Sequence, residues 1–114
     1  MTHTMKLAPA PFAYMEIGQK TIELRLWDEK RRCIRAGDEI VFTCVGNPTR
    51  CLTRRVVALH RFPSFEALYR VLPLSACGYT EEEIPSAHPS DMDLYYSPEE
   101  QSRWGVVGIE LTPV

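Results

Sequence analysis

One short segment near the start of the chain combines the alternation of a β-strand with a row of charges. Over residues 21–26 the apolar side chains occupy every second position, which is the period of a half-buried strand. The positions between them include Thr21, Glu23 and Arg25, and Lys20 directly precedes the strand. Opposite charges on the polar face of a strand require solvent or a ligand beside them. The segment therefore predicts a strand whose polar face forms the wall of a binding cleft.

Short apolar runs separated by turn residues indicate a core with several more strands. Besides residues 21–26, strands are expected over residues 5–7, 39–44, 51–59 and 105–111. A turn at residues 46–48 joins the second and third of these runs and favours antiparallel pairing between them. Gly108 inside the last run indicates a bulge or a close approach by another segment. Residues 27–36 contain four basic side chains and no apolar period, which predicts a loop.

Capping residues mark the expected helices. A helix over residues 9–17 should end at Gly18, and Ser64 should cap the next helix. Two capping boxes, each a Ser or Thr followed three residues later by Glu, mark further helix starts. They are Thr80 with Glu83 and Ser97 with Glu100. Strands and short helices together predict one mixed α+β domain.

Length and composition limit the domain count and the class of protein. The 114 residues, 45% of them hydrophobic, suffice for a single domain over residues 1–114 with one core. No stretch approaches the roughly 18 to 20 apolar residues that span a bilayer, and no signal core is present near residue 1. We therefore expect a cytoplasmic protein that does not bind membranes. Cysteines and histidines lack metal-ligand spacing, so we expect no metal and no cofactor.

The net charge of −2 conceals a division along the chain. Residues 1–70 hold 12 of the 13 Lys and Arg residues against 7 acids, a net charge of +5. Residues 71–114 hold one Arg against 8 acids, a net charge of −7. A basic half of this kind often indicates a polyanionic partner. The alternative is that the two halves face and neutralise one another.

Three features of the chain follow one another in a recognisable order. They are the motif Gly-x-Lys-x-x-Glu-x-Arg over residues 18–25, the basic loop, and the closing strand Gly-Val-Val-Gly-Ile-Glu-Leu over residues 105–111. Together they resemble the ASCH domain family (activating signal cointegrator homology). That family is similar to the PUA-like superfamily. The resemblance implies a pseudo β-barrel of five or six mostly antiparallel strands with short helices at its ends. It also implies that the motif lines a cleft, which has been proposed for the family as an RNA-binding surface.

The candidate ligand-binding residues lie on the motif and on the basic loop that comes after it. They are Gly18, Lys20, Thr21, Glu23, Arg25, Trp27, Lys30, Arg31 and Arg32. An ammonium and a guanidinium suit a phosphate or a base edge, and an indole can stack on a base. The alternative for Glu23 is an ion pair with Lys20 or Arg25, worth about 0 to 1 kcal/mol if exposed.

Further aromatic residues could stack on a base. They are Tyr14, Tyr95, Tyr96 and Trp104. Tyr95 and Tyr96 are adjacent and should point in different directions, so at most one of them is expected to reach the cleft.

Two functions remain open at this point. The first is binding of RNA, a nucleotide or a modified nucleoside without chemistry. The sequence does not indicate which proteins, if any, are partners. The second is hydrolysis of N-acetylated cytidine or a related nucleoside, because some small bacterial ASCH-like proteins are amidohydrolases. In that case Lys20 and Glu23 would be catalytic and would activate water or substrate. Glu23 stands where those enzymes have a threonine.

Overall fold

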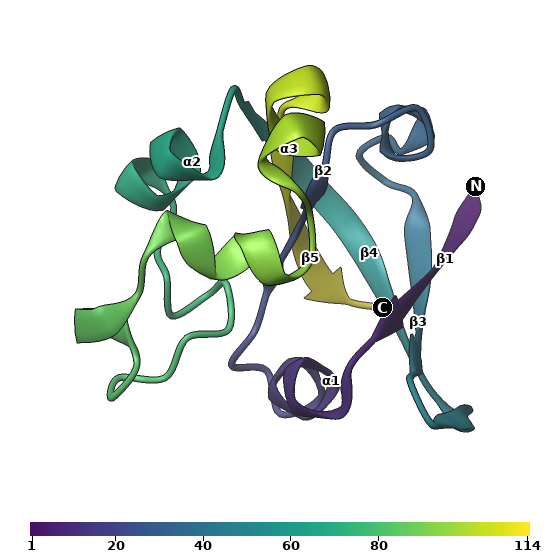
Figure 1. The fold of residues 1–114 in the computed structure, drawn as a ribbon. Helices are drawn as coiled ribbons and strands as arrows, with labels where there is room; N and C mark the ends of the chain where they lie inside the picture. Colours follow the sequence, from purple (N-terminus) through teal and green to yellow (C-terminus); the bar gives the residue numbers. More distant parts are fainter.

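Five strands form one mixed sheet that curls into a half-barrel (Figure 1). The computed structural model describes residues 1–114. The strands are β1 (Thr2–Leu7), β2 (Ile22–Leu26), β3 (Glu39–Cys44), β4 (Asn47–Phe62) and β5 (Val106–Pro113). Their order in the sheet is β1-β3-β4-β5-β2, with β1 parallel to β3 and every other pair antiparallel. This confirms the predicted α+β fold of a pseudo β-barrel with mostly antiparallel strands.

The hairpin between β3 and β4 is tighter than the sequence indicated. The chain reverses at Val45 and Gly46, and Gly46 has a φ of +84°, which suits glycine. Asn47 therefore already pairs with Cys44, so β4 begins four residues earlier than the predicted residue 51. β4 also continues to Phe62, and its register with β5 shifts between Val56 and Ala58.

Helices gather on one side of the sheet and at its end (Figure 1). The α-helices are α1 (Pro9–Glu16), α2 (Phe65–Val71) and α3 (Pro98–Trp104), and the 3-10 helices are η1 (Arg31–Cys33), η2 (Ile84–Ser86) and η3 (Pro89–Leu94). The Ser64 hydroxyl accepts a hydrogen bond from the Ala67 amide at 3.2 Å, as expected of an N-cap. Gly18 follows α1 with a φ of +86°. None of these helices is long and apolar enough to cross a membrane.

The predicted helix after Thr80 does not form. Thr80 and Glu83 do exchange the two hydrogen bonds of a capping box, at 2.9 and 3.3 Å. Pro85 and Pro89 come soon afterwards, however, and proline inside a helix removes a hydrogen bond and clashes with the preceding turn. The segment therefore becomes η2 and η3. The capping box at Ser97 does begin a helix, α3, as predicted.

The core consists of two clusters of buried apolar side chains. The larger packs Phe12 and Met15 of α1 against the inner face of the half-barrel. The smaller packs the apolar positions of β2 against Phe65 and Leu68 of α2 and Met92 of η3. Because α2 and η3 are held there, the segment between them lies next to the motif strand.

Gly108 of β5 is the site of a close approach, as its position in the strand indicated. A Cβ at this position would lie 2.5 Å from Leu72 Cδ1 and 3.2 Å from Ile22 Cγ2. We expect Gly108→Ala to lower the free energy of unfolding by about 1 to 3 kcal/mol, because the packed neighbours must move. Denaturant unfolding checks this, and the cost should be smaller in a Leu72→Ala background. Equal costs in both backgrounds would contradict the packing explanation.

Candidate functional site

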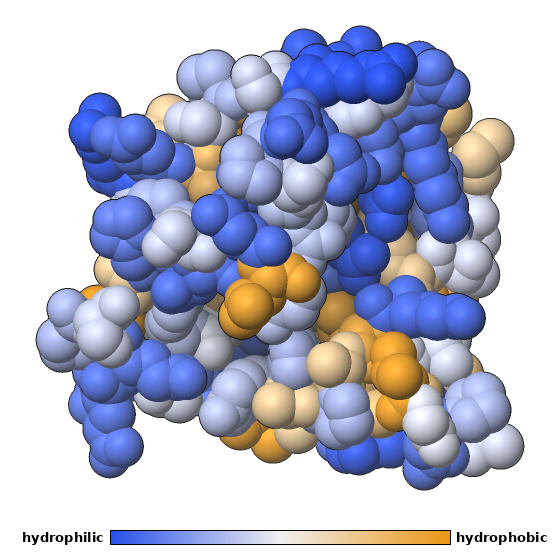
Figure 2. Space-filling view, in the orientation of Figure 1, coloured by the Kyte–Doolittle hydropathy of each residue, from blue (hydrophilic) through white to orange (hydrophobic).

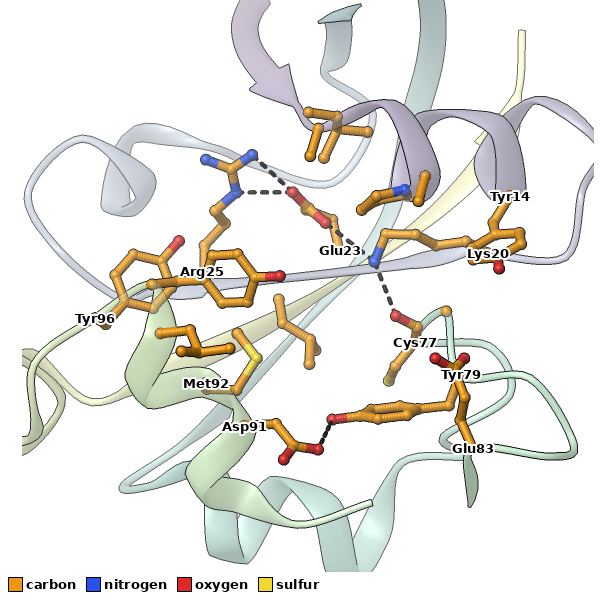
Figure 3. A pocket seen from close by; sticks show the side chains of 18 of the residues that line it. Tyr14, Lys20, Glu23, Arg25, Cys77, Tyr79, Glu83, Asp91, Met92 and Tyr96 are labelled. Atoms are coloured by element: carbon orange, nitrogen blue, oxygen red, sulfur yellow. Dashed lines mark hydrogen bonds and ion pairs between the residues drawn. The ribbon is translucent and has the colours of Figure 1, made fainter. Parts of the chain in front are cut away.

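A cavity of about 520 Å³ lies where the β1 to α1 junction, the motif strand β2 and residues 77–96 meet. In the orientation of Figure 1, apolar surface gathers around a hollow near the centre of this face (Figure 2). Within the cavity, charged and aromatic side chains come from each of these segments (Figure 3). The polar groups of the motif are therefore placed against a largely apolar recess.

Lys20 is held in the cavity wall by two hydrogen bonds and an ion pair. Its Nζ donates to the Ile22 carbonyl at 2.8 Å and the Cys77 carbonyl at 2.9 Å, and lies 3.1 Å from Glu23 Oε1. An ammonium has three N–H donors, so all of them are used. Gly78 permits this arrangement, because its φ is +110° and a Cβ there would lie 3.3 Å from Lys20 Cδ. Lys20 is thus fully coordinated by the protein.

Glu23 lies between two cations (Figure 3). Its Oε2 is 2.8 Å from Arg25 Nε and 2.7 Å from Arg25 Nη2, while its Oε1 faces Lys20. Burial alone would raise the pKa of Glu23, but the two cations outweigh burial and hold its pKa below the usual value. We call Lys20, Glu23 and Arg25 the charged triad, and its net charge is positive.

The polar face of the motif strand, expected to meet solvent or a ligand, is buried. Lys20 and Glu23 are each only 5% exposed, so this face of β2 is not a wet face. Glu23 forms the ion pairs that the sequence allowed as an alternative, with Lys20 and Arg25 together, but in a buried setting. The strand is covered on one face by the smaller apolar cluster and on the other by the walls of the cavity.

Free hydrogen-bonding atoms lie at two places in the cavity. Arg25 Nη2 also donates to the Lys6 carbonyl at 2.8 Å, and the guanidinium faces Tyr96, but Nη1 is not the donor of any of its hydrogen bonds to Glu23 or Lys6. Asp91 Oδ2 accepts hydrogen bonds from the Tyr79 hydroxyl at 2.8 Å and the His88 amide at 3.1 Å, which leaves Oδ1 free. Figure 3 shows Arg25 and Asp91 on different sides of the cavity. The recess therefore offers a donor at one side and an acceptor at the other.

Four tyrosines line the cavity. They are Tyr14, Tyr79, Tyr95 and Tyr96. Tyr96 stacks on Phe65 with ring centroids 6.3 Å apart, and burial raises its pKa although Arg25 acts in the opposite direction. Tyr95 is 66% exposed. The expectation that at most one of Tyr95 and Tyr96 reaches the cleft is wrong, because both line the cavity. Tyr95 has a helical conformation, in which neighbouring side chains do not point to opposite faces.

Cys77 also lines the cavity, but it is not an activated nucleophile. Burial raises the pKa of its thiol to about 11, against the opposing effect of Lys20. The thiol is therefore protonated at neutral pH, and a thiol is a weak nucleophile compared with its thiolate. No group of His, Cys, Asp and Glu side chains is placed to hold a metal ion.

The structure brings only part of the predicted site together. Lys20, Glu23 and Arg25 line the cavity. Gly18 and Thr21 flank the triad without lining the cavity: Gly18 ends α1, and the Thr21 amide donates to the Ala76 carbonyl at 2.8 Å.

The predicted residues of the basic loop lie elsewhere. Trp27 and Arg32 line a second, separate hollow. Lys30 is exposed, and Arg31 pairs with Asp28 at 3.1 Å. The basic residues 30–32 are consecutive in the sequence, but their side chains point in different directions and do not form one continuous surface.

Sequence reasoning missed the residues that close the cavity opposite the motif. Cys77, Gly78, Tyr79, Asp91 and Met92 reach the motif only because α2 and η3 pack on β2. Among these residues only Asp91 belongs to a local sequence pattern, because it completes a capping box with His88 at the start of η3.

Comparisons with known proteins agree with this architecture. A sequence model described as the ASCH domain matches residues 5–114. The crystal structure of hypothetical protein PH0355 is similar, with 29% identity, a TM-score of 0.81 and full coverage of both chains. The solution NMR structure of protein PF0455 from Pyrococcus furiosus has 30% identity and a TM-score of 0.67, covering 100% of this chain and 98% of the other. The search of curated proteins returned no match. The chain belongs to the ASCH domain family.

Proposed function

We propose that this protein binds single-stranded RNA and holds one unstacked nucleobase in the cavity. The proposal rests on a recess that is lined by tyrosines. The guanidinium of Arg25 lies in this recess and is held in place by the buried carboxylate of Glu23. Sequence-specific proteins usually read RNA through unstacked bases that stack on aromatic rings and present their edges to polar groups. Membership of the ASCH family, which is often linked to RNA binding, supports the same conclusion.

The size and charge of the cavity suit a base better than a phosphate. Its volume of about 520 Å³ lies within the range of small-ligand sites, roughly 300 to 1,000 Å³. Its charged lining residues are three cations, Lys6, Lys20 and Arg25, and three acids, Glu23, Glu83 and Asp91. A phosphate would meet carboxylates in such a recess, whereas a neutral base would not be repelled.

The free atoms of the cavity indicate which edge a base would present. Arg25 Nη1 can donate to a carbonyl oxygen or a ring nitrogen, and Asp91 Oδ1 can accept from an amino group. Adenine, cytosine and guanine carry both kinds of group on their edges, whereas uracil has no amino group. We therefore expect a base with an amino group to bind more tightly than uracil.

The hydrolytic alternative gains no support from Lys20 and Glu23. Every N–H of the Lys20 ammonium is already used, so none remains to stabilise an oxyanion. Glu23 has both oxygens engaged by cations and a lowered pKa, which makes it a poor general base. Binding is therefore the function that this geometry supports best.

A titration of labelled single-stranded RNA, followed by fluorescence anisotropy, tests the proposal. We expect binding that weakens as salt rises from about 50 to about 200 mM, because cations that contact phosphates release counterions. A duplex of the same sequence should compete poorly, because its bases are stacked and paired. Absence of binding at low salt, or equal competition by the duplex, would contradict the proposal.

A further inference from the structure

A second hollow of about 380 Å³ lies beyond the far end of β2 from Lys20. We call it the tryptophan hollow, and its walls include Trp27, Arg32, Arg61, Phe62, Pro63 and Trp104. The Trp27 amide donates to the Gly105 carbonyl at 3.0 Å, which joins the end of β2 to the end of α3. A Cβ at Gly105 would lie 3.1 Å from the Phe62 carbonyl, so the end of β4 is packed against the same point. Three chain segments thus converge to form this hollow.

Guanidinium groups stack on both indoles of the tryptophan hollow. Arg61 lies 4.9 Å from the centroid of Trp27, while Arg103 and Arg32 lie 4.7 and 5.8 Å from that of Trp104. A guanidinium stacked on an aromatic ring keeps its N–H edge directed away from the ring. Such edges are suited to phosphate oxygens.

Arg61, Arg103 and Arg32 have no carboxylate partner, unlike half of the ten arginines of the chain. Five arginines form ion pairs with acids, namely Arg25, Arg31, Arg50, Arg55 and Arg70. Arg61 and Arg103 make no hydrogen bond to the protein, and Arg32 donates only its Nε, to the Trp27 carbonyl at 2.8 Å. No acidic residue lines the tryptophan hollow. The unpaired N–H groups of these arginines at an acid-free hollow are available to an anion.

The tryptophan hollow and the cavity are neighbours along one strand. Arg25 in the cavity and Trp27 in the hollow are two residues apart, about 6.6 Å at the rise of a β-strand. The basic loop follows Trp27, and its Arg32 lines the hollow while its neighbour Arg31 is close enough to the cavity to act electrostatically on the Tyr96 hydroxyl. A single strand whose base enters the cavity would therefore carry its backbone past the tryptophan hollow.

We propose that the tryptophan hollow binds a phosphodiester of the same single strand, through the free N–H edges of Arg61 and Arg32. This inference rests on the proposed function, because it takes the strand that enters the cavity as its ligand. The cavity, with its balanced charges, would select the base, and the tryptophan hollow would supply the salt-dependent affinity.

Exposed Arg61 offers a test that should not disturb folding. We expect Arg61→Gln to weaken binding of a single-stranded RNA about tenfold and to reduce its salt slope by about 0.7. Affinity for free nucleosides should not change. Arg70→Gln is the matched control, because it removes the same charge from an exposed arginine that pairs with Glu66 on α2. Equal effects of the two substitutions on RNA affinity would overturn the inference.

Tryptophan emission provides a second readout, because the only two tryptophans of the chain both line the hollow. RNA should change this emission, whereas free nucleosides and inorganic phosphate at equal concentration should not. RNA binding with unchanged emission, or an equal response to inorganic phosphate, would overturn the inference. If Arg61→Gln weakens RNA binding but the cavity variant Tyr95→Ala does not, the hollow is supported and the cavity proposal fails.

Discussion

Replacing Glu23 with glutamine is expected to lower the free energy of unfolding by about 3 to 5 kcal/mol, because the substitution leaves two cations in the cavity wall without their anion. Glu23 is 5% exposed and contacts both Lys20 and Arg25 at 3.1 Å or less. An amide can accept from one of these cations, but its own NH₂ group then faces the other. Urea unfolding of the wild type and the variant measures the difference.

Glu39→Gln is the control for this prediction. Glu39 pairs with Arg55 at 3.2 Å in an exposed setting, so its loss should cost no more than about 1 kcal/mol. If Glu23→Gln costs as little as Glu39→Gln, the charged triad is only a surface ion pair and Arg25 is not held rigidly for a ligand.

The loss of unfolding free energy caused by Glu23→Gln should depend on pH in a defined direction. The folded-state pKa of Glu23 lies below the ordinary value of 4.5, so its stabilisation is present above about pH 4.5 and is lost as the pH falls through the folded-state pKa. The difference between wild type and Glu23→Gln should therefore shrink below about pH 4.5. A difference that stays constant there would contradict the assigned charge state.

Replacing Tyr95 with alanine is expected to weaken binding of single-stranded RNA by about 1 to 3 kcal/mol, the usual contribution of a base stacked on an aromatic ring. Tyr95 lines the cavity, is 66% exposed and makes no side-chain hydrogen bond, so its ring is available to a ligand. The free energy of unfolding should change little, because few contacts are lost. Anisotropy titrations and urea unfolding measure the two quantities.

Tyr95→Phe is the matched variant, because it removes the hydroxyl and keeps the ring. It should bind RNA as the wild type does if stacking is the contribution of this residue. Wild-type affinity in Tyr95→Ala, or equal losses in both variants, would argue against a base stacked at this position.

Local patterns in the sequence predicted most of the elements. Alternation over residues 21–26, the N-cap Ser64 and the glycine after α1 act within a few residues, and the structure has a strand, a helix start and a helix end there. Prediction failed after Thr80, where the capping box was present but Pro85 and Pro89 prevented the helix. A capping signal marks a helix start, whereas the length of the helix depends on the residues that come after the cap.

The candidate site was predictable only on its motif side. The order of charges identified Lys20, Glu23 and Arg25, but alternation alone could not show that β2 is covered on both faces. The opposite wall comes from residues 77–96, about 55 to 70 positions later, which α2 and η3 bring onto the strand. Such placement depends on tertiary packing and leaves no periodic pattern in the sequence.

An NMR titration of isotope-labelled protein with a short single-stranded RNA tests the central claim most directly. If a base enters the cavity, the amide signals of Gly78, Tyr79 and Tyr95 should shift with increasing RNA. Those of Thr2 and His3, which lie at the β1 edge of the sheet and do not line the cavity, should not shift. Shifts confined to that edge, or no shifts at RNA concentrations that saturate binding, would contradict a base-binding cavity between the motif and η3.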